Sequence, residues 1–295
     1  VIHDNQSLCY ELLFFQKKIP LVTTIHHPIS KDLKFQLKST KSIFLKFLMI
    51  RWHSFLRMQI KVAKKLNSVI VVSKSSKQDI HDDFGLKKEA MKVILNGIDT
   101  EAFFPDENIK KIPFRIVTSA SADVPLKGLD YLLEAFSEVI KIFPDSTLQI
   151  IGSSKQGGHT SRKINDLNIK EKVQFNNDLS FKEVRDLYCS ADVVVIPSLY
   201  EGFGFAIGEA MACRVPVITT SGGAIPEVIE DCGILVSPGN SKELEEAMLK
   251  LLPDEEKKSF FAEKGFNRII EHLQWEKVAK LMTESYETEI NRITN

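Results

Sequence analysis

Short apolar runs alternate with amphipathic helical patterns along almost the whole chain. The apolar runs predict ten strands, at residues 1–3, 21–25, 68–73, 92–95, 115–119, 147–151, 172–175, 192–197, 215–219 and 233–236. Several runs are continuous rather than alternating, as in Val193-Val194-Val195-Ile196. A continuous apolar run is typical of a strand buried on both faces of a parallel sheet.

Helical patterns lie between these runs. The clearest covers residues 128–143 and places six apolar side chains on one stripe: Leu129, Leu132, Leu133, Phe136, Val139 and Ile140. Another helix is expected after Ser180, because Ser180 and Glu183 have the spacing of a capping box. The repetition of strand, helix and strand predicts an α/β protein with doubly wound parallel sheets.

A polar stretch with two prolines, residues 104–113, separates two series of strands and is the predicted linker. We predict a first domain at residues 1–108, a second at 109–270 and a C-terminal helix at 271–295 that packs back toward the first domain. The first series has fewer strands than the second and begins at once with a strand at Val1. At roughly 30 residues per strand–helix unit, we expect about 60–100 residues to be missing from its start.

Composition excludes several classes of protein. The chain has 295 residues, of which 43% are hydrophobic, and Lys+Arg and Asp+Glu both number 39. Zero net charge disfavours a nucleic-acid partner, and no apolar run is long enough to span a membrane. The four cysteines are scattered without metal-binding spacing, which disfavours structural zinc or a disulfide framework and indicates a cytoplasmic location.

One segment has a different character. Residues 33–66 carry nine Lys or Arg side chains and no acidic one, interleaved with apolar residues such as Phe44, Phe47 and Trp52. The ordinary interpretation, which we favour, is a crossover helix that packs its apolar stripe on the sheet and keeps its basic face in solvent. The second interpretation is a helix that lies on an anionic membrane surface. A long helix can do both.

The strongest chemical signal lies at residues 198–212, between two predicted strands (Ser-Leu-Tyr-Glu-Gly-Phe-Gly-Phe-Ala-Ile-Gly-Glu-Ala-Met-Ala). This is the carboxyl end of a parallel sheet, where open α/β sheets bind ligands. Gly202 and Gly204 permit a tight turn or close approach to a ligand, and a helix beginning near Phe205 would direct free N–H groups at a phosphate. Glu209 lies among apolar helical residues, where a carboxylate needs hydrogen-bond donors. The two hydroxyls of a ribose would supply them.

Four motifs in order resemble the retaining glycosyltransferases of family 4, which have the GT-B fold. The first is the Glu-x7-Glu pair of Glu201 and Glu209. The others are Asn-Gly-Ile-Asp at 96–99, Lys-Gly-Leu at 127–129 and Gly-Gly-Ala-Ile-Pro-Glu at 222–227. The resemblance implies two Rossmann-like domains facing a cleft, the first of them truncated here.

The resemblance also implies roles for single residues. Glu209 would bind the nucleotide ribose, and Glu201 would lie beside the transferred sugar. Backbone amides of Gly202, Phe203, Gly204 and Phe205 would contact the sugar and the diphosphate. Lys127 would neutralise the diphosphate, which also explains a cation at a helix N-terminus, where the helix dipole disfavours it unless an anion is bound.

The sequence departs from the family at one position. Members typically have an Arg five or six residues before the Lys, whereas Ser121-Ala122-Asp123 occupies that stretch here. We expect the Ser121 hydroxyl and the backbone to substitute; the alternative is weaker donor binding. The loop at 152–158, beginning with Gly152, lacks the Gly-Lys-Ser/Thr ending of an ATP-binding loop and is expected to flank the nucleotide base. Neither a metal nor another cofactor is expected, because Asp-rich metal motifs are absent and the family generally acts without a metal.

In the first domain, the strand at 21–25 ends in His26-His27-Pro28. His26 occupies the position where similar enzymes have a His that contacts the donor sugar near the reacting centre. It is therefore the third predicted catalytic residue, with Glu201 and Lys127. His27 and His3 are weaker candidates.

Together these features predict a retaining glycosyltransferase that moves a sugar from a nucleoside diphosphate sugar to an acceptor hydroxyl. The basic segment favours a glycan or lipid-linked acceptor at the cytoplasmic face of the membrane, in polysaccharide or glycolipid biosynthesis. One alternative is a non-catalytic module that binds a nucleotide sugar or a membrane. Another is a different GT-B enzyme, such as a nucleotide-sugar epimerase or a phosphorylase.

Overall fold

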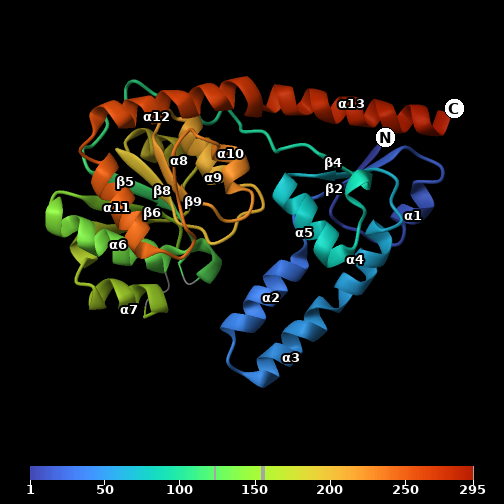
Figure 1. The fold of residues 1–295 in the computed structure, drawn as a ribbon, viewed down its shortest axis with the longest axis horizontal. Helices are drawn as coiled ribbons and strands as arrows, with labels where there is room; N and C mark the ends of the chain where they lie inside the picture. Colours follow the sequence, from blue (N-terminus) through green and yellow to red (C-terminus); the bar gives the residue numbers. More distant parts are fainter. Residues whose placement is uncertain (123, 154–156, 295) are drawn as a thin grey trace. The chain divides into compact units, whose positions relative to one another are not determined.

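A computed structural model describes residues 1–122, 124–153 and 157–294, apart from the side chain of Ser39. The chain divides into two compact units, residues 1–96 with 276–295, and residues 97–275. Each unit is built around one parallel sheet (Figure 1). The predicted class, α/β with two parallel-sheet domains, is therefore confirmed.

The N-terminal unit contains a sheet of four parallel strands in the order β1-β2-β3-β4. The strands are β1 (Ile2–Asn5), β2 (Leu21–Ile25), β3 (Val69–Val71) and β4 (Met91–Val93). All four coincide with predicted strands to within a few residues. The central strand β2 is buried along its whole length, which is the environment that its continuous apolar run predicts.

The helices of this unit lie before, between and after the strands. They are α1 (Leu12–Phe15), α2 (Ile29–Ser39), α3 (Ile43–Trp52), α4 (Leu56–Ala63), α5 (Lys74–Phe84) and α13 (Trp275–Thr294), with 3₁₀ helices at His53–Phe55 and Lys88–Ala90. From Glu276 onward, α13 belongs to this unit. Its Val278 packs against Val22, Ile70 and Ile94 of the strand region, and Lys92 Nζ donates a 2.8 Å hydrogen bond to Ser285 Oγ.

The second unit contains six parallel strands in the order β10-β9-β8-β5-β6-β7. The strands are β5 (Arg115–Ser119), β6 (Thr147–Ile151), β7 (Val173–Asn176), β8 (Val193–Ile196), β9 (Val217–Thr220) and β10 (Ile234–Val236). All six were predicted. The chain runs outward from β5 in one direction and from β8 in the other, so the strand order reverses between these two neighbours. Such a switch point is where doubly wound sheets bind ligands.

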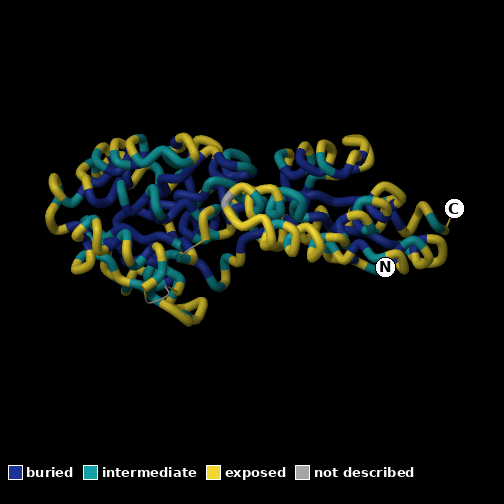
Figure 2. Tube along the Cα trace, turned by 90° about the horizontal axis from the view of Figure 1, so that it is seen from below, coloured by how far each residue is buried: buried dark blue, intermediate teal, exposed yellow. Residues whose placement is uncertain are grey.

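The helices of this unit follow the strands. They are α6 (Leu129–Ile142), α7 (His159–Asp166), α8 (Phe181–Cys189), α9 (Phe205–Ala212), α10 (Ile225–Ile229), α11 (Ser241–Leu251) and α12 (Glu255–Arg268), with 3₁₀ helices at Pro125–Lys127 and Lys170–Lys172 and a π-helical turn at Ile269–Leu273. The predicted stripe of α6 is confirmed: its side chains are buried in the main core except Ile140, which is partly buried. Buried segments run through the middle of both units (Figure 2).

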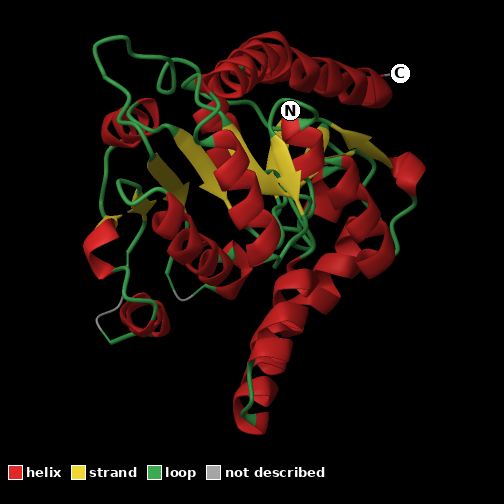
Figure 3. Ribbon diagram, turned by 60° about the vertical axis from the view of Figure 1, so that its left-hand side comes forward, coloured by secondary structure: helices red, strands yellow, loops and turns green. Residues whose placement is uncertain are grey.

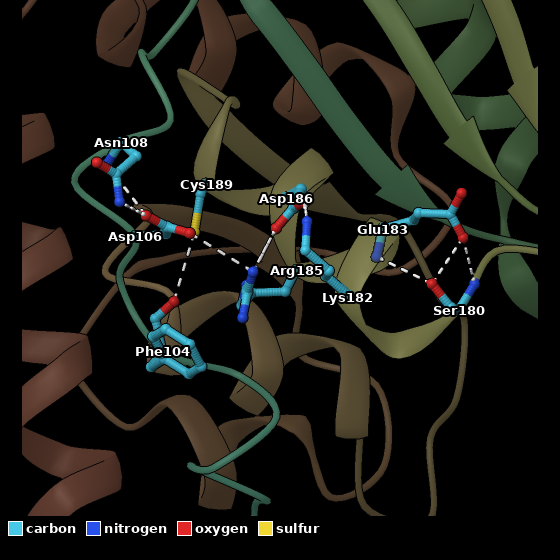
Figure 4. Close-up of polar contacts among 9 residues, drawn as sticks. All are labelled: Phe104, Asp106, Asn108, Ser180, Lys182, Glu183, Arg185, Asp186 and Cys189. Carbon is cyan, nitrogen blue, oxygen red and sulfur yellow. Dashed lines mark hydrogen bonds and ion pairs between the residues drawn. The ribbon is translucent and has the colours of Figure 1, made fainter.

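The stretch predicted as a linker packs on α8 instead (Figure 4). The Arg185 guanidinium lies 4.4 Å from the Phe104 ring centre, and its Nη2 lies 3.5 Å from Asp106 Oδ2. Cys189 Sγ donates to the Phe104 carbonyl at 3.5 Å. The division between the compact units accordingly falls between residues 96 and 97, before the predicted boundary at 108/109. Polar composition indicated a solvated linker here, but these polar groups have partners within the unit.

The basic segment is divided among several elements rather than one crossover helix. Of these, α4 packs on the unit's core through Leu56, Gln59, Val62 and Ala63, whereas none of the residues of α3 is buried. The favoured crossover interpretation is therefore correct for α4 and wrong for α3. Among the described residues, the search for a helix long and apolar enough to cross a membrane finds none.

Candidate functional site

The predicted donor-site residues of the second unit gather at the carboxyl ends of β5 and β8. The chain leaving β5 passes through the 3₁₀ helix Pro125–Lys127 into α6, and the chain leaving β8 forms a loop at 197–204 before α9. The two connections are joined by a hydrogen bond of 2.8 Å from the Leu199 amide to the Leu126 carbonyl. The switch point of the sheet therefore lies beneath two loops that hold each other in place.

Two predicted catalytic residues meet there. Lys127 Nζ donates to Glu201 Oε1 at 2.8 Å, with the Lys side chain 38% and the Glu side chain 18% exposed. Gly128, which follows the lysine, has φ +65°, and a Cβ on it would lie 2.0 Å from the Pro197 carbonyl oxygen. Only glycine permits this close crossing of the two loops, so Gly128 brings Lys127 next to Glu201.

Ser198 is a residue that the sequence interpretation left out of the site. Its hydroxyl donates to Glu201 Oε1 at 2.7 Å, the same oxygen that accepts from Lys127. Ser198 is buried, directly after β8. The sequence could have indicated this role, because Ser198 stands at a strand end, three residues before Glu201. Two donors on one oxygen hold the Glu201 carboxylate in a single orientation.

Replacement of Ser198 by Ala is expected to lower the transfer rate by about three- to tenfold, because one of the two hydrogen bonds that orient the Glu201 carboxylate is lost while the one from Lys127 remains. Ser198→Thr keeps the hydroxyl and is expected to restore most of the rate. Steady-state kinetics with saturating donor check this. Equal losses in the Ala and Thr variants would contradict the positioning role and point to a steric effect.

The motif at 222–227 supports the loop from its other side. The Ala224 amide donates to the Glu201 carbonyl at 2.9 Å, and Glu201 forms an isolated parallel bridge with Gly223. A Cβ on Gly223 would lie 2.3 Å from the Glu201 carbonyl oxygen. The two glycine-rich motifs, 20 residues apart, therefore form one layer behind the Glu201 side chain.

Helix α9 begins at Phe205, where the sequence predicted it. Its N-cap is Gly204, with φ +103° and no side chain to satisfy the first amides of the helix. The buried Phe203 ring packs edge-on against Phe205, with ring centres 5.0 Å apart. The N-terminus of α9 thus offers positive partial charge beside the Glu201 loop, which suits an anionic ligand.

Glu209 lies one turn inside α9. Its helical neighbours Ile207, Gly208, Ala210 and Met211 are all buried. Within the described part of the chain no hydrogen bond to the Glu209 carboxylate is found, and burial raises its pKa to about 7. A half-buried carboxylate that lacks donors is costly for the free protein. It becomes favourable when a ligand's hydroxyl groups donate to it.

Ser121 and Gly152 lie at the neighbouring ends of β5 and β6. A Cβ on Gly152 would lie 2.8 Å from the Ala120 carbonyl oxygen and 3.4 Å from Ser121 Cα. The Ala122 amide donates to the Ser153 carbonyl at 3.3 Å. The structure therefore brings Ser121 and Gly152 together at the sheet edge. Asp123 and residues 154–156 of the predicted base-flanking loop lie outside the described residues.

His26 belongs to the N-terminal unit, at the carboxyl end of β2. Its Nε2 lies 2.6 Å from Asn5 Oδ1, and its backbone amide donates to Gln6 Oε1 at 2.7 Å. Burial, and then the nearby His27 and His3, lower the pKa of His26. The ring is therefore neutral at pH 7 and keeps a fixed orientation through Asn5.

The two weaker histidine candidates have contacts of an ordinary structural kind. His3 bridges Thr24 Oγ1 and the Tyr286 hydroxyl at 2.8 and 2.7 Å. His27 Nε2 lies 2.8 Å from Asp32 Oδ2, in the first turn of α2. Of the three, His26 is the one held at a strand end by an Asn that the sequence interpretation did not single out.

Comparison with known proteins adds independent evidence. Residues 1–102 match the family described as Glycosyltransferase Family 4, and residues 113–254 match the family described as Glycosyl transferases group 1. The MMP alpha-(1->4)-mannosyltransferase of Mycolicibacterium hassiacum is 36% identical over 99% of this chain and 71% of its own length. A probable sucrose-phosphate synthase of Thermosipho melanesiensis is 33% identical over 75% of this chain and 54% of its own length.

Solved structures have the same fold. Sucrose-phosphate synthase from Thermosynechococcus elongatus superimposes with a TM-score of 0.79 at 22% identity, covering 99% of this chain and 74% of the other. HepE of Anabaena, solved in complex with UDP, gives 0.74 at 22% identity, covering 92% and 73%. This chain thus spans between about half and three quarters of the length of these relatives. The chain has two parallel-sheet units of the GT-B kind, and both family matches occur in order along it. It therefore belongs to the family 4 glycosyltransferases, also described as glycosyl transferases group 1.

Proposed function

We propose that the protein is a retaining glycosyltransferase that moves a sugar from a nucleoside diphosphate sugar to an acceptor hydroxyl. The observation that supports this most is the Lys127–Glu201 pair, 2.8 Å apart at the switch point of the second sheet. Beside it, Glu209 is a carboxylate whose pKa burial raises to about 7. A cation for a diphosphate and an acceptor for ribose hydroxyls are the two groups that such a donor requires.

In the proposed complex the ribose hydroxyls donate to Glu209, and the diphosphate lies between Lys127 and the N-terminus of α9. The amides of Gly202 to Phe205 contact the diphosphate and the sugar. Ser121 and Gly152 lie at the ends of β5 and β6, where the missing side chain of Gly152 lets the two backbones approach closely. This arrangement follows the general rule that helix N-termini at a sheet's carboxyl edge bind phosphates.

The difficult step in transfer is departure of the diphosphate. As the bond from the anomeric carbon to the phosphate oxygen breaks, negative charge develops on that oxygen. Lys127 and the α9 dipole stabilise this charge by preorganised electrostatics. The acceptor oxygen forms its bond on the same face of the sugar and its proton passes to the departing phosphate, so the configuration is retained. Glu201 lies beside the sugar and holds Lys127 toward it. The family resemblance predicts that His26 also acts in the transfer.

The relatives support a nucleoside diphosphate sugar as the donor and narrow the choice of its base and its sugar. HepE of Anabaena is described in complexes with UDP and with UDP-glucose, and several relatives are described as mannosyltransferases, two of them GDP-mannose-dependent. We therefore propose a hexosyl donor carried on UDP or GDP, with a glycan or lipid-linked acceptor at the cytoplasmic side of the membrane. All four cysteines are free, as expected in a reducing compartment.

Calorimetric titration of the chain with UDP, GDP, ADP and CMP tests the donor site. We expect one nucleoside diphosphate to bind with a dissociation constant on the order of micromolar, and CMP, which has a single phosphate, to bind much more weakly. Circular dichroism confirms that the chain is folded. No binding of any nucleotide to the folded chain would overturn the proposal.

Product analysis separates transfer from the alternatives. With the bound nucleotide's hexosyl donor and a hydroxyl acceptor, NMR of the product is expected to show the anomeric configuration of the donor. Transfer is expected to persist in a metal chelator, because Lys127 and the α9 dipole carry the role of a cation. Inversion at a sugar carbon without transfer would indicate an epimerase, and a glycan cleaved by inorganic phosphate would indicate a phosphorylase.

A further inference from the structure

Helices α2 and α3 form a hairpin that extends away from the strands of its own unit (Figures 1 and 3). We call residues 29–52 the basic hairpin. Its helices are joined by the short turn at residues 40–42, and α3 begins at Ile43 with Ser42 as its N-cap. The turn is its free end, because α4 continues from α3 back to the core.

Eight of the ten residues of α3 are apolar, and most of them are exposed. The most exposed large apolar side chains are Ile43 (85%), Trp52 (78%), Phe44 (68%), Phe47 (61%) and Ile50 (55%). A helix that is hydrophobic all round is ordinarily buried, either in a protein core or in a lipid environment. A contiguous apolar patch of this kind marks a surface that another phase or partner covers.

Positive charge surrounds this patch. Of the nine basic side chains between residues 33 and 66, Lys34 has an acidic partner, Asp83, at 2.5 Å. Lys38 and Lys41 are exposed beside the turn, and Arg51 is exposed next to Trp52. The hairpin therefore combines apolar and aromatic side chains with unbalanced positive charge, from Lys38 and Lys41 at its free end to Arg51 at the far end of α3.

The positive charge of the hairpin indicates what covers its apolar patch. A second copy of the chain, docked hairpin to hairpin, would bring two strongly positive segments together and leave them repelling each other at close range. An anionic bilayer satisfies both features, because its headgroups attract Lys and Arg while its acyl region accepts Phe, Ile and Trp. Trp is also the side chain that favours the boundary between the two regions.

A hollow on the hairpin has the same chemistry. It is open to solvent, has a volume of about 560 Å³, and is lined by Leu48, Met49 and Trp52 together with Arg51 and Gln36. Apolar side chains beside a guanidinium match a lipid chain that ends in a phosphate.

We propose that the basic hairpin anchors this protein to anionic phospholipid membranes, with Ile43, Phe44 and Phe47 inserted among the acyl chains and Lys38, Lys41 and Arg51 on the headgroups. The anchoring is peripheral and reversible. It is independent of the donor site, so its failure leaves the proposed transfer reaction untouched, and loss of transfer activity leaves the anchoring untouched.

Co-sedimentation of the full chain with vesicles tests the proposal. We expect little binding to phosphatidylcholine alone and strong binding when about one third of the lipid is phosphatidylglycerol. Binding is expected to weaken with rising salt, because screening shortens the range of the headgroup attraction. Equal binding to neutral and anionic vesicles, or none to either, would overturn it.

Variants of exposed residues locate the anchor without endangering the fold. Lys38→Glu with Lys41→Glu is expected to lower vesicle binding by at least about tenfold, since each basic residue near the surface contributes roughly a fivefold factor. Phe44→Ser with Phe47→Ser is expected to lower it by a similar factor through lost insertion. The matched control is Lys87→Glu with Lys88→Glu, two exposed lysines of the same unit outside the hairpin, which is expected to lower binding less than threefold. A larger effect of the control than of the hairpin variants would contradict the location.

Fluorescence of Trp52 reports insertion directly. The chain has two tryptophans, so Trp275→Phe leaves Trp52 as the single reporter. On anionic vesicles its emission is expected to shift to the blue and to be quenched by lipids brominated on their chains. An unshifted emission would overturn the insertion of the hairpin into the membrane. A dimer in solution that Phe44→Ser with Phe47→Ser dissolves would replace the membrane by a second copy of the chain as the occupant.

Discussion

Replacement of Glu209 by Gln is expected to weaken nucleotide binding while stabilising the free protein. The two effects have one cause, the burial of a carboxylate that the described residues leave without a hydrogen bond. In the complex this carboxylate accepts hydrogen bonds from two hydroxyls, and hydrogen bonds to a charged group contribute more than neutral ones. Loss of the charge is expected to reduce affinity for the preferred nucleotide by about 10- to 100-fold.

The stability effect depends on pH with a definite sign. Burial raises the pKa of Glu209 from 4.5 to about 7, so the unfolded chain loses this proton at lower pH than the folded chain. Below pH 4.5 the group is protonated in both states and has no effect. As pH rises to 7 the folded state loses stability, and above 7 the penalty is constant at about 3 kcal/mol. Glu209→Gln is expected to recover about 1–3 kcal/mol at pH 8 and little at pH 4.5.

Urea unfolding at the two pH values and calorimetry with the nucleotide measure both effects. Glu246→Gln, an exposed glutamate of the same unit, is the matched control and is expected to change neither by much. Nucleotide binding by the natural protein is also expected to strengthen as pH rises through 7, because only the carboxylate accepts both hydroxyls. Unchanged affinity of the Gln variant at pH 8 would remove Glu209 from the donor site.

Replacement of Lys127 by Ala is expected to lower the turnover number by about 100- to 1000-fold, the loss typical of a group that stabilises charge in the transition state. The fold is expected to tolerate the change. The ion pair with Glu201 is partly exposed on the lysine side, and such pairs contribute about 1 kcal/mol or less. A large loss of rate with little loss of stability is therefore the expected result.

Lys163 provides the control for this variant. It also forms an ion pair with a glutamate in the same unit, Glu134, at 2.5 Å, but on α7, away from the loops that hold Lys127. Lys163→Ala is expected to keep the natural turnover number and to show a comparable small loss in stability. Stopped-flow or steady-state kinetics with both variants measure the two turnover numbers. Equal turnover in Lys127→Ala and Lys163→Ala would contradict the role of Lys127.

Periodicity and local chemistry predicted most of the secondary structure. Continuous apolar runs such as Val193–Ile196 form buried strands. A strand that is covered on both faces has no side facing solvent, so apolar residues occupy every position along it. Ser180 and Glu183 form the predicted capping box, since its hydrogen bonds involve residues only three apart. Gly204 and Phe205 mark the start of α9 as expected, because a glycine in the left-handed region ends one element and begins another.

Periodicity and local chemistry did not predict the contacts between residues that are far apart in the sequence. The polar stretch at 104–113 suggested a solvated linker, and only the folded unit shows that Arg185 pairs with Asp106 and lies over Phe104. Likewise the apolar residues of α3 suggested a helix packed on the sheet. The structure leaves them exposed, because whether an apolar side is covered depends on which elements the topology brings against it.

The sequence by itself determined which residue types follow strands β5 and β8: Lys127, Glu201, Glu209 and the glycines around them, in an order that resembles one enzyme family. Tertiary structure decided that Lys127 and Glu201, 74 residues apart, form one pair, and that Ser198 orients the same oxygen. It also decided that Glu209 is half-buried and has no hydrogen bond to its carboxylate among the described residues. The reason is physical: local propensities act over a few residues, whereas burial and pairing arise where β5 and β8, far apart in the chain, become neighbours in one sheet.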